Sequence, residues 1–455
     1  MPSGNALEAA RGSRRVELDG RFVIPGLWDE HVHMTQWALA TGRIDLAGAA
    51  SAQEAAAVVR SHLEASGAPS DGRTLVGIAF RDAVWRDAPG LAMLDGATAG
   101  VPTALISHDL HCVWLNSAAA ARYGVAPGAD GLLREEPAFA LTRELGRLPD
   151  DAVDALVRNA GRSAAARGIV GIVDFEMVWN RDPWVRRIAD GFDSLRVEAG
   201  VYPQDLERAA GLGMRTGQLV PEGRGLLRVG PLKVLIDGSL NTRTAFCVDP
   251  YPHGGRGLLT VNEAELLALL TRAGRAGFVP AVHAIGDGAN EVALNAFAAA
   301  GIRGRIEHAQ FVREQDFARF GELGLTASVQ PAHALDDRDA ADSNWAGRTG
   351  RAFPLRSLLD AGAVLALGSD APVAPLEPWT AMSAATTRAR GDGRAPWHPE
   401  QALTRQEALA ASSRGRRRID VGDPADVAVL DADPLAVSDA GFAAMPVSAT
   451  LVAGR

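Results

Sequence analysis

The chain has 455 residues, and its 47% apolar and 22% charged residues are typical of a globular protein and exclude wholesale disorder. The 55 Asp and Glu residues outnumber the 46 Lys and Arg residues, and the net charge of −9 argues against nucleic acid as the main partner. The length allows about three domain-sized units, although a single α/β barrel can absorb about 250 residues.

The first predicted strand lies within residues 21–33, where apolar residues run up to a polar end. Residues 45–165 follow it and are too many for one crossover helix. They carry their own helical pattern at 51–66 and two strand-like segments, TLVGIAF and PTALIS. This stretch predicts an inserted α+β subdomain.

Seven further predicted strands alternate with Ala- and Leu-rich helical segments such as 262–277 and 289–301, which end in Gly. The seven strands lie within 168–175, 195–202, 231–238, 278–286, 305–310, 325–331 and 363–370. Eight apolar strands that alternate with helices predict a parallel sheet covered on both faces. The expected fold class is therefore α/β, a (β/α)8 TIM barrel with its active site at the carboxyl ends of the strands.

The C-terminal tail predicts short antiparallel strands that join residues 15–25 in a small sheet built from both ends of the chain. The predicted domains are 1–25 with 415–455 for this terminal unit, and 26–414 for the barrel with its insertion at about 45–165.

Cys112 and Cys247 lie far apart and outside any CxxC pattern, so we expect neither a disulfide framework nor a thiolate zinc site. The first residues lack the apolar core of a signal peptide, and no uncharged apolar run reaches about 18 residues. These features predict a cytoplasmic protein that does not insert into membranes.

His31 and His33 stand two residues apart at the end of the first predicted strand. Residues i and i+2 of a strand point to one face, so the two imidazoles can converge on one ion such as zinc. The alternative is a pair of surface histidines. His283, His308 and Asp370 end the fifth, sixth and eighth strands, where an isolated buried polar group would be unfavourable. Together the five residues indicate a metal site at the mouth of the barrel.

Lys233, the only lysine in the chain, lies among apolar residues near the end of the fourth strand. A buried amine tends to lose its charge, and a neutral amine can react with carbon dioxide to give a carbamate that bridges two metal ions. Alternatively, Lys233 pairs with Asp237 or reaches solvent. The spacing alone leaves these possibilities open.

Several motifs in the chain, taken together, resemble those of the amidohydrolase superfamily, specifically its amidohydrolase-3 branch (the YtcJ-like group). The matching segments are VIPGLWDEHVH, HDLHCVWLNSAA, LKVLIDGSLNTRTA, HAIGDGAN, RIEHAQ, ASVQPAH, LGSDAPV and GDPADVAVLDADP. The resemblance covers nearly the whole chain and implies a (β/α)8 barrel with a small β-sandwich formed by both termini. Fewer residues precede the VIPGLWDEHVH segment than in family members, so we expect the N-terminal part of the sandwich to be shortened.

The resemblance also implies roles for single residues. His31 and His33 match the ligands of the more buried metal, His283 and His308 match those of a second metal, and Lys233 matches a lysine that is carboxylated in binuclear members. Asp370 matches an aspartate that contacts metal and moves the catalytic proton. Substrate contacts are expected at His111, Trp114, Asn116, Arg243, Gln330 and His333.

The implied activity is hydrolysis by metal-activated hydroxide of a carbon–nitrogen bond other than a peptide bond, in an N-acyl, formamide or cyclic amide group. One or two divalent ions, with zinc as the first choice, a small-molecule substrate and a homodimer are expected. Two alternatives stay open. One is a mononuclear, deaminase-like hydrolase in which Lys233 is a base or forms an ion pair. The other is a non-catalytic binding or regulatory protein on a barrel scaffold.

Overall fold

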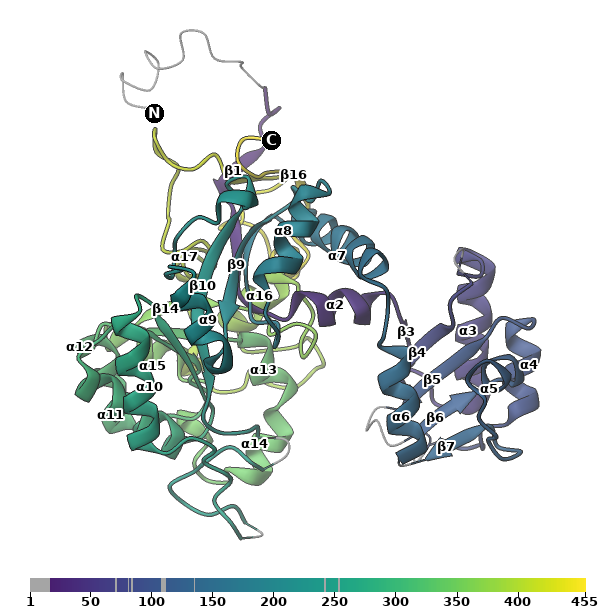
Figure 1. The fold of residues 1–455 in the computed structure, drawn as a ribbon. Helices are drawn as coiled ribbons and strands as arrows, with labels where there is room; N and C mark the ends of the chain where they lie inside the picture. Colours follow the sequence, from purple (N-terminus) through teal and green to yellow (C-terminus); the bar gives the residue numbers. More distant parts are fainter. Residues whose placement is uncertain are drawn as a thin grey trace. The chain divides into compact units, whose positions relative to one another are not determined.

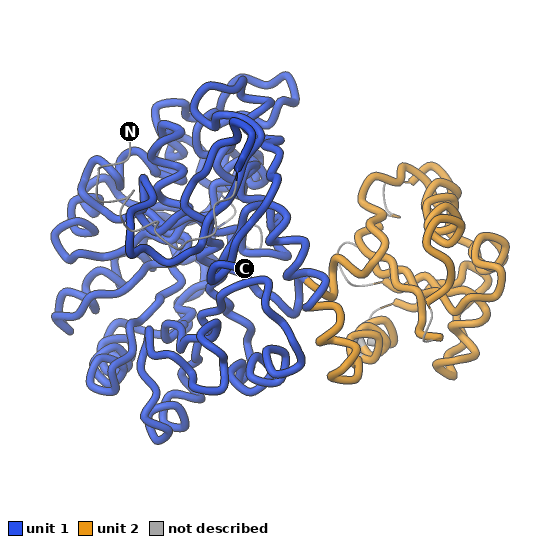
Figure 2. Tube along the Cα trace, turned by 90° about the horizontal axis from the view of Figure 1, so that it is seen from above, with its two compact units in different colours: residues 1–37, 158–455 blue, residues 38–157 orange. Residues whose placement is uncertain are grey.

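The computed structural model of the chain describes residues 17–69, 72–80, 82, 85–107, 112–134, 136–240, 243–252 and 254–455. The chain forms two compact units (Figure 2). Unit 1 consists of Met1–Trp37 and Arg158–Arg455, and unit 2 consists of Ala38–Val157.

Unit 1 is built around an eight-stranded sheet in which all paired neighbours are parallel (Figure 1). Its strand order is β14-β13-β12-β11-β10-β9-β8-β2. The strands are β2 (Leu27–Val32), β8 (Ile169–Asp174), β9 (Arg196–Val201), β10 (Leu227–Leu235), β11 (Pro280–Ala284), β12 (Arg305–His308), β13 (Thr326–Val329) and β14 (Val364–Leu367). Each overlaps one predicted strand, so the predicted fold class is confirmed.

The sheet closes into a barrel where its first and last strands meet. Among the described residues β14 and β2 form no ladder of their own, but two backbone hydrogen bonds join their carboxyl ends. The Asp370 N–H donates to the carbonyl of His31 at 2.7 Å, and the His33 N–H donates to the carbonyl of Ala371 at 2.8 Å. Gly368 permits this approach, because a Cβ atom there would lie 2.7 Å from the backbone nitrogen of His31.

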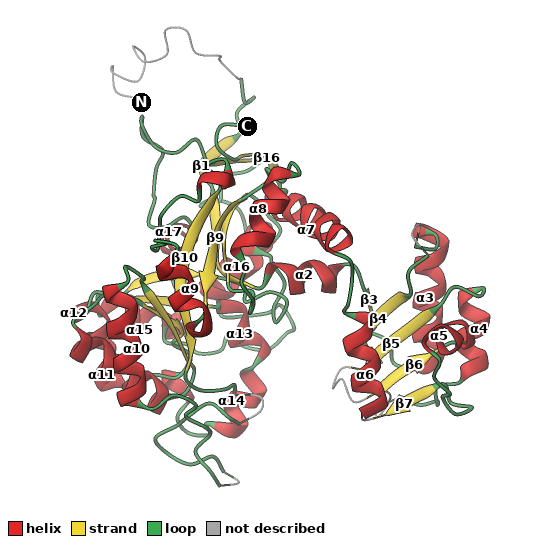
Figure 3. Ribbon diagram, viewed as in Figure 1, coloured by secondary structure: helices red, strands yellow, loops and turns green. Residues whose placement is uncertain are grey.

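Helices cover the outside of the barrel (Figure 3). Apart from α2 (Met34–Thr41) and α7 (Asp150–Ala165), which run across the boundary between the units, unit 1 contains α8 (Arg181–Ala189), α9 (Leu206–Gly211), α10 (Glu263–Arg275), α11 (Asp287–Ala300), α12 (Phe317–Glu322), α13 (Pro331–Asp336), α14 (Arg338–Asn344), α15 (Leu355–Asp360), α16 (Pro378–Thr387), α17 (Arg405–Ser412) and α18 (Asp439–Ala443). The start of α10 is set by a capping box between Asn262 and Glu265, and its apolar side buries Leu266 and Leu270.

The two ends of the chain meet in an antiparallel sheet of β1 (Phe22–Pro25), β15 (Val427–Leu430) and β16 (Val447–Leu451). Phe22 pairs with Leu430, and Val427 pairs with Leu451. Over the residues that the structure describes, this is a single three-stranded sheet, whereas a sandwich needs two.

Unit 2 has a five-stranded sheet of order β3-β4-β5-β6-β7. Its elements are β3 (Ile44–Asp45), α3 (Ala52–Ser66), β4 (Leu75–Phe80), α4 (Leu91–Thr98), β5 (Thr103–Ser107), β6 (Cys112–Leu115), α5 (Ser117–Tyr123), β7 (Leu132–Arg134) and α6 (Glu136–Leu145). The sheet is parallel from β3 to β5 and antiparallel from β5 to β7. Across the described part of both units, we find no helix with the length and apolarity needed to cross a membrane.

Candidate metal centre

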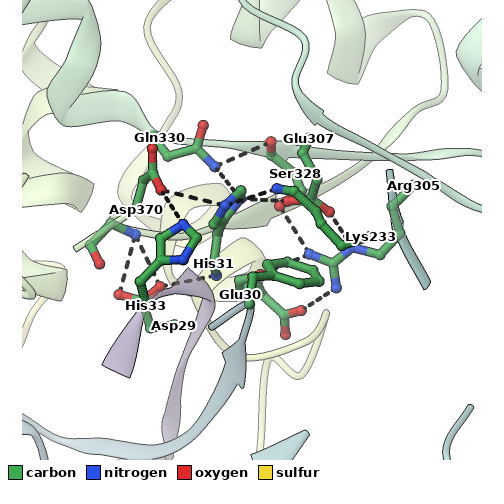
Figure 4. Close-up of polar contacts among 12 residues, drawn as sticks. Asp29, Glu30, His31, His33, Lys233, Arg305, Glu307, Ser328, Gln330 and Asp370 are labelled. Atoms are coloured by element: carbon green, nitrogen blue, oxygen red, sulfur yellow. Dashed lines mark hydrogen bonds and ion pairs between the residues drawn. The ribbon is translucent and has the colours of Figure 1, made fainter. Parts of the chain in front are cut away.

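Three side chains at the meeting point of the first and last barrel strands form a compact group of ligand atoms (Figure 4). Nε2 of His31 and Nε2 of His33 each lie 3.4 Å from Oδ1 of Asp370. With metal–ligand bonds of about 2.0–2.1 Å, two ligands of a tetrahedral zinc ion lie roughly 3.4 Å apart. The two-nitrogen, one-oxygen set therefore fits a divalent ion in both chemistry and spacing.

His308, His333 and Asp370 form a second such group. Their ligand atoms also lie within 4.8 Å of one another, and all three residues are buried. Within the described residues, neither Nδ1 of His308 nor Nε2 of His333 has a hydrogen-bond partner. His333, which the resemblance suggests as a substrate contact, is thus brought among groups that can bind metal.

His283 lies beside the second group rather than in it. Its Nε2 atom is 3.3 Å from the carbonyl oxygen of Gly238 and 3.4 Å from Oδ1 of Asp237, and its ring centroid is 4.5 Å from that of His308. Burial, reinforced by the nearby positive charge of Lys233, lowers the pKa of His283 to about 3. The ring is therefore neutral, which is the state that a metal ligand requires.

Lys233 is buried under His31. Its Nζ atom lies 3.0 Å from Nε2 of His31 and 4.5 Å from the centroid of the Phe175 ring. Burial lowers the pKa of Lys233 to about 8, so a fraction of the amine is neutral near pH 7. Asp237, the alternative partner of Lys233, accepts backbone hydrogen bonds from Phe246, Ile285 and Gly286, and the described contacts include none between it and Lys233.

Glu307 is a site residue that the sequence reasoning did not single out. Its Oε2 atom lies 2.7 Å from Nδ1 of His31, and its Oε1 atom accepts a hydrogen bond from Nε of Arg305 at 2.9 Å. Burial alone would raise the pKa of this carboxyl, but Arg305 and His31 together hold it well below its usual range. An ionised carboxylate can only accept, so Nδ1 of His31 carries the hydrogen, and Nε2, which lies 3.0 Å from Nζ of Lys233, keeps the lone pair that a metal ligand needs.

Glu307 belongs to a network of paired charges that extends from the site through Arg305 to Glu30 (Figure 4). Arg305 also donates to Glu30 at 2.7 Å, and Arg414 donates to Glu30 at 2.7 Å and to Glu198 at 2.6 Å. The sequence motif RIEH indicates such a network of paired charges. Arg305 and Glu307 are two residues apart on a buried strand, so both point to the same side and need partners there.

The backbone is strained at two of the candidate ligands. His308 has φ of 74° and Asp370 has φ of 59°, in the left-handed region that residues with a Cβ atom rarely adopt. Such strain persists where the surrounding structure enforces it, and it is concentrated at functional sites. The strained residues lie at the end of β12, for His308, and just after β14, for Asp370.

The other predicted substrate contacts are spread over the two units. Gln330 is buried next to His31, with its Nε2 atom 3.5 Å from Nδ1, and Arg243 lies on an exposed turn. In unit 2, Trp114 packs in the core, while Asn116 caps α5 and accepts a hydrogen bond from the backbone of Thr103. These contacts give Trp114 and Asn116 structural roles. His111 lies outside the described residues.

The chain matches known proteins in both sequence and structure. A model described as the amidohydrolase family matches residues 14–455. The chain is 28% identical over 442 residues to the protein LONG AFTER FAR-RED 3 of Arabidopsis thaliana, covering 88% of this chain and 75% of the relative. It is 26% identical over 505 residues to the N-substituted formamide deformylase of Arthrobacter pascens, covering 98% and 90%. An uncharacterized metal-dependent hydrolase from Pyrococcus furiosus has a similar crystal structure, with a TM-score of 0.77, 26% identity and coverage of 95% and 92%.

Proposed function

Because the chain belongs to the amidohydrolase family of metal-dependent hydrolases, we propose that it cleaves a carbon–nitrogen bond other than a peptide bond, in a formamide, N-acyl or cyclic amide group. The similarity to an N-substituted formamide deformylase supports this choice and makes an N-substituted formamide the first substrate to test. The observation that carries the proposal is the 3.4 Å spacing of Oδ1 of Asp370 from both Nε2 atoms of the His31–His33 pair.

His31, His33 and Asp370 are proposed to hold one divalent ion, and zinc suits their nitrogen and oxygen donors. For a second ion, the resemblance supports His283 and His308, together with Lys233 as a carbamate formed with carbon dioxide. A bound divalent ion lowers the pKa of water toward about 7 and polarises a carbonyl oxygen.

Asp370 is proposed to carry the proton. It accepts a proton from the attacking water and returns it to the leaving nitrogen, as a general base and then a general acid. The neighbouring histidines counteract the effect of burial and hold the pKa of Asp370 well below its ordinary value, so the carboxylate starts the reaction ionised. Gln330, buried beside His31, and Arg243, on its exposed turn, are proposed to contact the substrate.

The test compares wild type with Asp370→Asn on a panel of N-substituted formamides, N-acyl amines and cyclic amides, with metal content measured in the same samples. General acid–base groups contribute about 10²–10⁴-fold, so we expect kcat/KM to fall by at least about 100-fold. Asp193→Asn, a change on the exposed surface of unit 1, is the control and should leave kcat/KM unchanged. A chain that binds no zinc, and whose Asp370→Asn variant hydrolyses the panel as fast as wild type, would contradict the proposal.

A further inference from the structure

Unit 2 contains a cavity of about 550 Å³, and this cavity shares no residue with the candidate metal centre. Its lining residues lie between Leu39 and Leu156, so all of them belong to unit 2. Small-molecule sites in proteins have volumes of about 300–1,000 Å³. The cavity is therefore large enough for a ligand, and the proposed function makes no use of it.

The polar part of the lining is rich in arginine. Among the described residues that line the cavity, Glu144 is the one carboxylate, and it pairs with Arg147 at 2.9 Å. Arg122 donates to the uncharged carbonyl of Gly72 at 2.6 Å. The lining thus carries an excess of positive charge in a chain whose net charge is −9. The four arginine residues of the lining are Arg43, Arg73, Arg122 and Arg147.

Arg43 lacks a partner for its charge. Its side chain is half-buried, and within the part of the chain that the structure describes its guanidinium forms neither a hydrogen bond nor an ion pair. Burial lowers the pKa of Arg43, and no neighbouring carboxylate offsets this effect. A guanidinium presents N–H donors in a rigid fork that matches the oxygen atoms of a carboxylate or a phosphate. An anion in the cavity would supply the partner that Arg43 lacks.

The rest of the lining suits an apolar body that carries a polar group. Leu75, Leu145 and Leu156 are among the apolar side chains of the wall. The hydroxyl groups of Thr74 and Tyr123 lie 2.7 Å apart, and one of them donates to the other. The hydrogen of the accepting hydroxyl stays available for an oxygen atom of a ligand. Apolar walls with a few polar groups are typical of small-molecule sites.

We propose that this cavity binds a small organic anion, a carboxylate or phosphate group on an apolar body, and that Arg43 pairs with the charge of the anion. The site uses no metal ion and no residue of unit 1, so the proposal does not depend on the proposed function. The alternative is a cavity filled with water, which would hydrate Arg43 without any preference for an anion.

The experiment titrates the full chain, as purified, with phenylacetate, phenyl phosphate and the uncharged 2-phenylethanol, and calorimetry gives each Kd. The proteins compared are wild type, Arg43→Gln, Arg43→Lys and Arg122→Gln. Arg60→Gln is the control, because Arg60 is exposed on α3 of the same unit and lies outside the lining. The Tm of each protein is measured without a probe. A crystal with 4-bromophenylacetate locates the probe through the anomalous signal of bromine.

We expect at least one of the two anions to bind at least about tenfold more tightly than 2-phenylethanol, and the tighter anion identifies the acidic group. Arg43→Gln should weaken anion binding about tenfold or more, the loss expected for hydrogen bonds to a charged group. Arg43→Lys and Arg122→Gln should weaken it less, and Arg60→Gln should match wild type. Since Arg43 has no partner within the described fold, Arg43→Gln should keep the wild-type Tm, whereas loss of a structural arginine would lower it.

Four results would overturn the proposal: neither anion binds, 2-phenylethanol binds as tightly as the anions, Arg43→Gln binds them like wild type, or the bromine lies outside the cavity. An anion that binds at the metal centre would give the third and fourth of these results. The proposed function would stand in every case, because it is tested at Asp370.

Discussion

Nδ1 of His31 lies 2.7 Å from Oε2 of Glu307, and both side chains are almost completely buried, with 1% and 0% exposed. This contact fixes which ring nitrogen of His31 faces the barrel mouth. Arg305 binds the other oxygen of the same carboxylate, so Glu307 is held in place from both sides. Glu307 is therefore a positioning residue, which acts through His31.

Replacing Glu307 by Gln is expected to weaken the binding of the first metal ion by about 10–100-fold, the range found when hydrogen-bond partners of metal-ligating histidines are removed. The amide keeps the size of the side chain but loses the charge that orients the His31 ring. The measurement is the Kd for Zn²⁺ by competition with a chelator. Ser328→Ala, which removes another partner of Arg305, is the control and should bind Zn²⁺ like wild type. Equal affinities for Glu307→Gln and wild type would show that Glu307 has only a packing role.

Lys233 offers a test of carboxylation, because no other lysine can contribute a side-chain signal. In wild type loaded with zinc and ¹³C-labelled bicarbonate, we expect one carbamate resonance that Lys233→Ala lacks, and metal loading that rises with bicarbonate only in wild type. The neutral amine required for this reaction follows from burial, which lowers the pKa of Lys233 to about 8. Equal zinc loading of both proteins at every bicarbonate concentration would exclude a bridging role.

Glu30 is expected to contribute strongly to stability. It is 3% exposed and accepts hydrogen bonds from both Arg305 and Arg414, so Glu30→Gln leaves two guanidinium groups short of a negative charge inside the barrel. Because Arg305 keeps Glu307 and Arg414 keeps Glu198 as a partner, we expect the variant to lower the free energy of unfolding by about 1.5–3 kcal/mol, the range for hydrogen bonds to charged groups. Urea denaturation measures the change. Glu322→Gln, at an exposed position in α12, should change it by less than about 0.5 kcal/mol.

Glu407 predicts a pH dependence of stability. Hydrogen bonds from Arg356 and from the Thr404 backbone and hydroxyl lower the pKa of Glu407 to about 2, from 4.5. A lowered carboxyl pKa stabilises the fold above about pH 4.5, and this contribution disappears as the pH falls toward 2. Since the side chain is 25% exposed, solvent screening reduces the effect to about 1 kcal/mol at pH 7.

The comparison for this prediction is Glu407→Gln against wild type by thermal unfolding between pH 7 and pH 3. We expect the difference in unfolding free energy to be about 1 kcal/mol at pH 7 and to shrink steadily below pH 4.5. Glu322→Gln corrects for the general loss of stability in acid. A difference that stays constant over the whole range would mean that the Arg356 contact contributes nothing through charge.

The barrel could be predicted from sequence because each strand is a short apolar run and the runs alternate with helices. The ends of the strands were equally visible, since His31, His283 and His308 each stand where a predicted strand ends. Which of them converge was not visible. That depends on side-chain direction at strand ends, where the positive φ of His308 redirects the ring.

The other features that could not be predicted are contacts between residues that lie far apart in the sequence. Glu307 and His31 are 276 residues apart, and the sequence around either residue does not indicate their contact. Asn116 shows that a motif can also suggest a role for a side chain that the structure uses differently. A motif places it in a family-typical segment, but only the structure shows that its side chain is already occupied as a helix cap and as a partner of Thr103.

The barrel has one seam without a strand ladder among the residues described, and it lies between β14 and β2, the strands that lead to Asp370 and to the His31–His33 pair. An ion bound by these residues would connect the first strand of the barrel to the last. Assembly of the ring and acquisition of the ion would then be one event. Release of the ion should first raise amide exchange along this seam, while the opposite side of the barrel, at β10 and β11, stays protected.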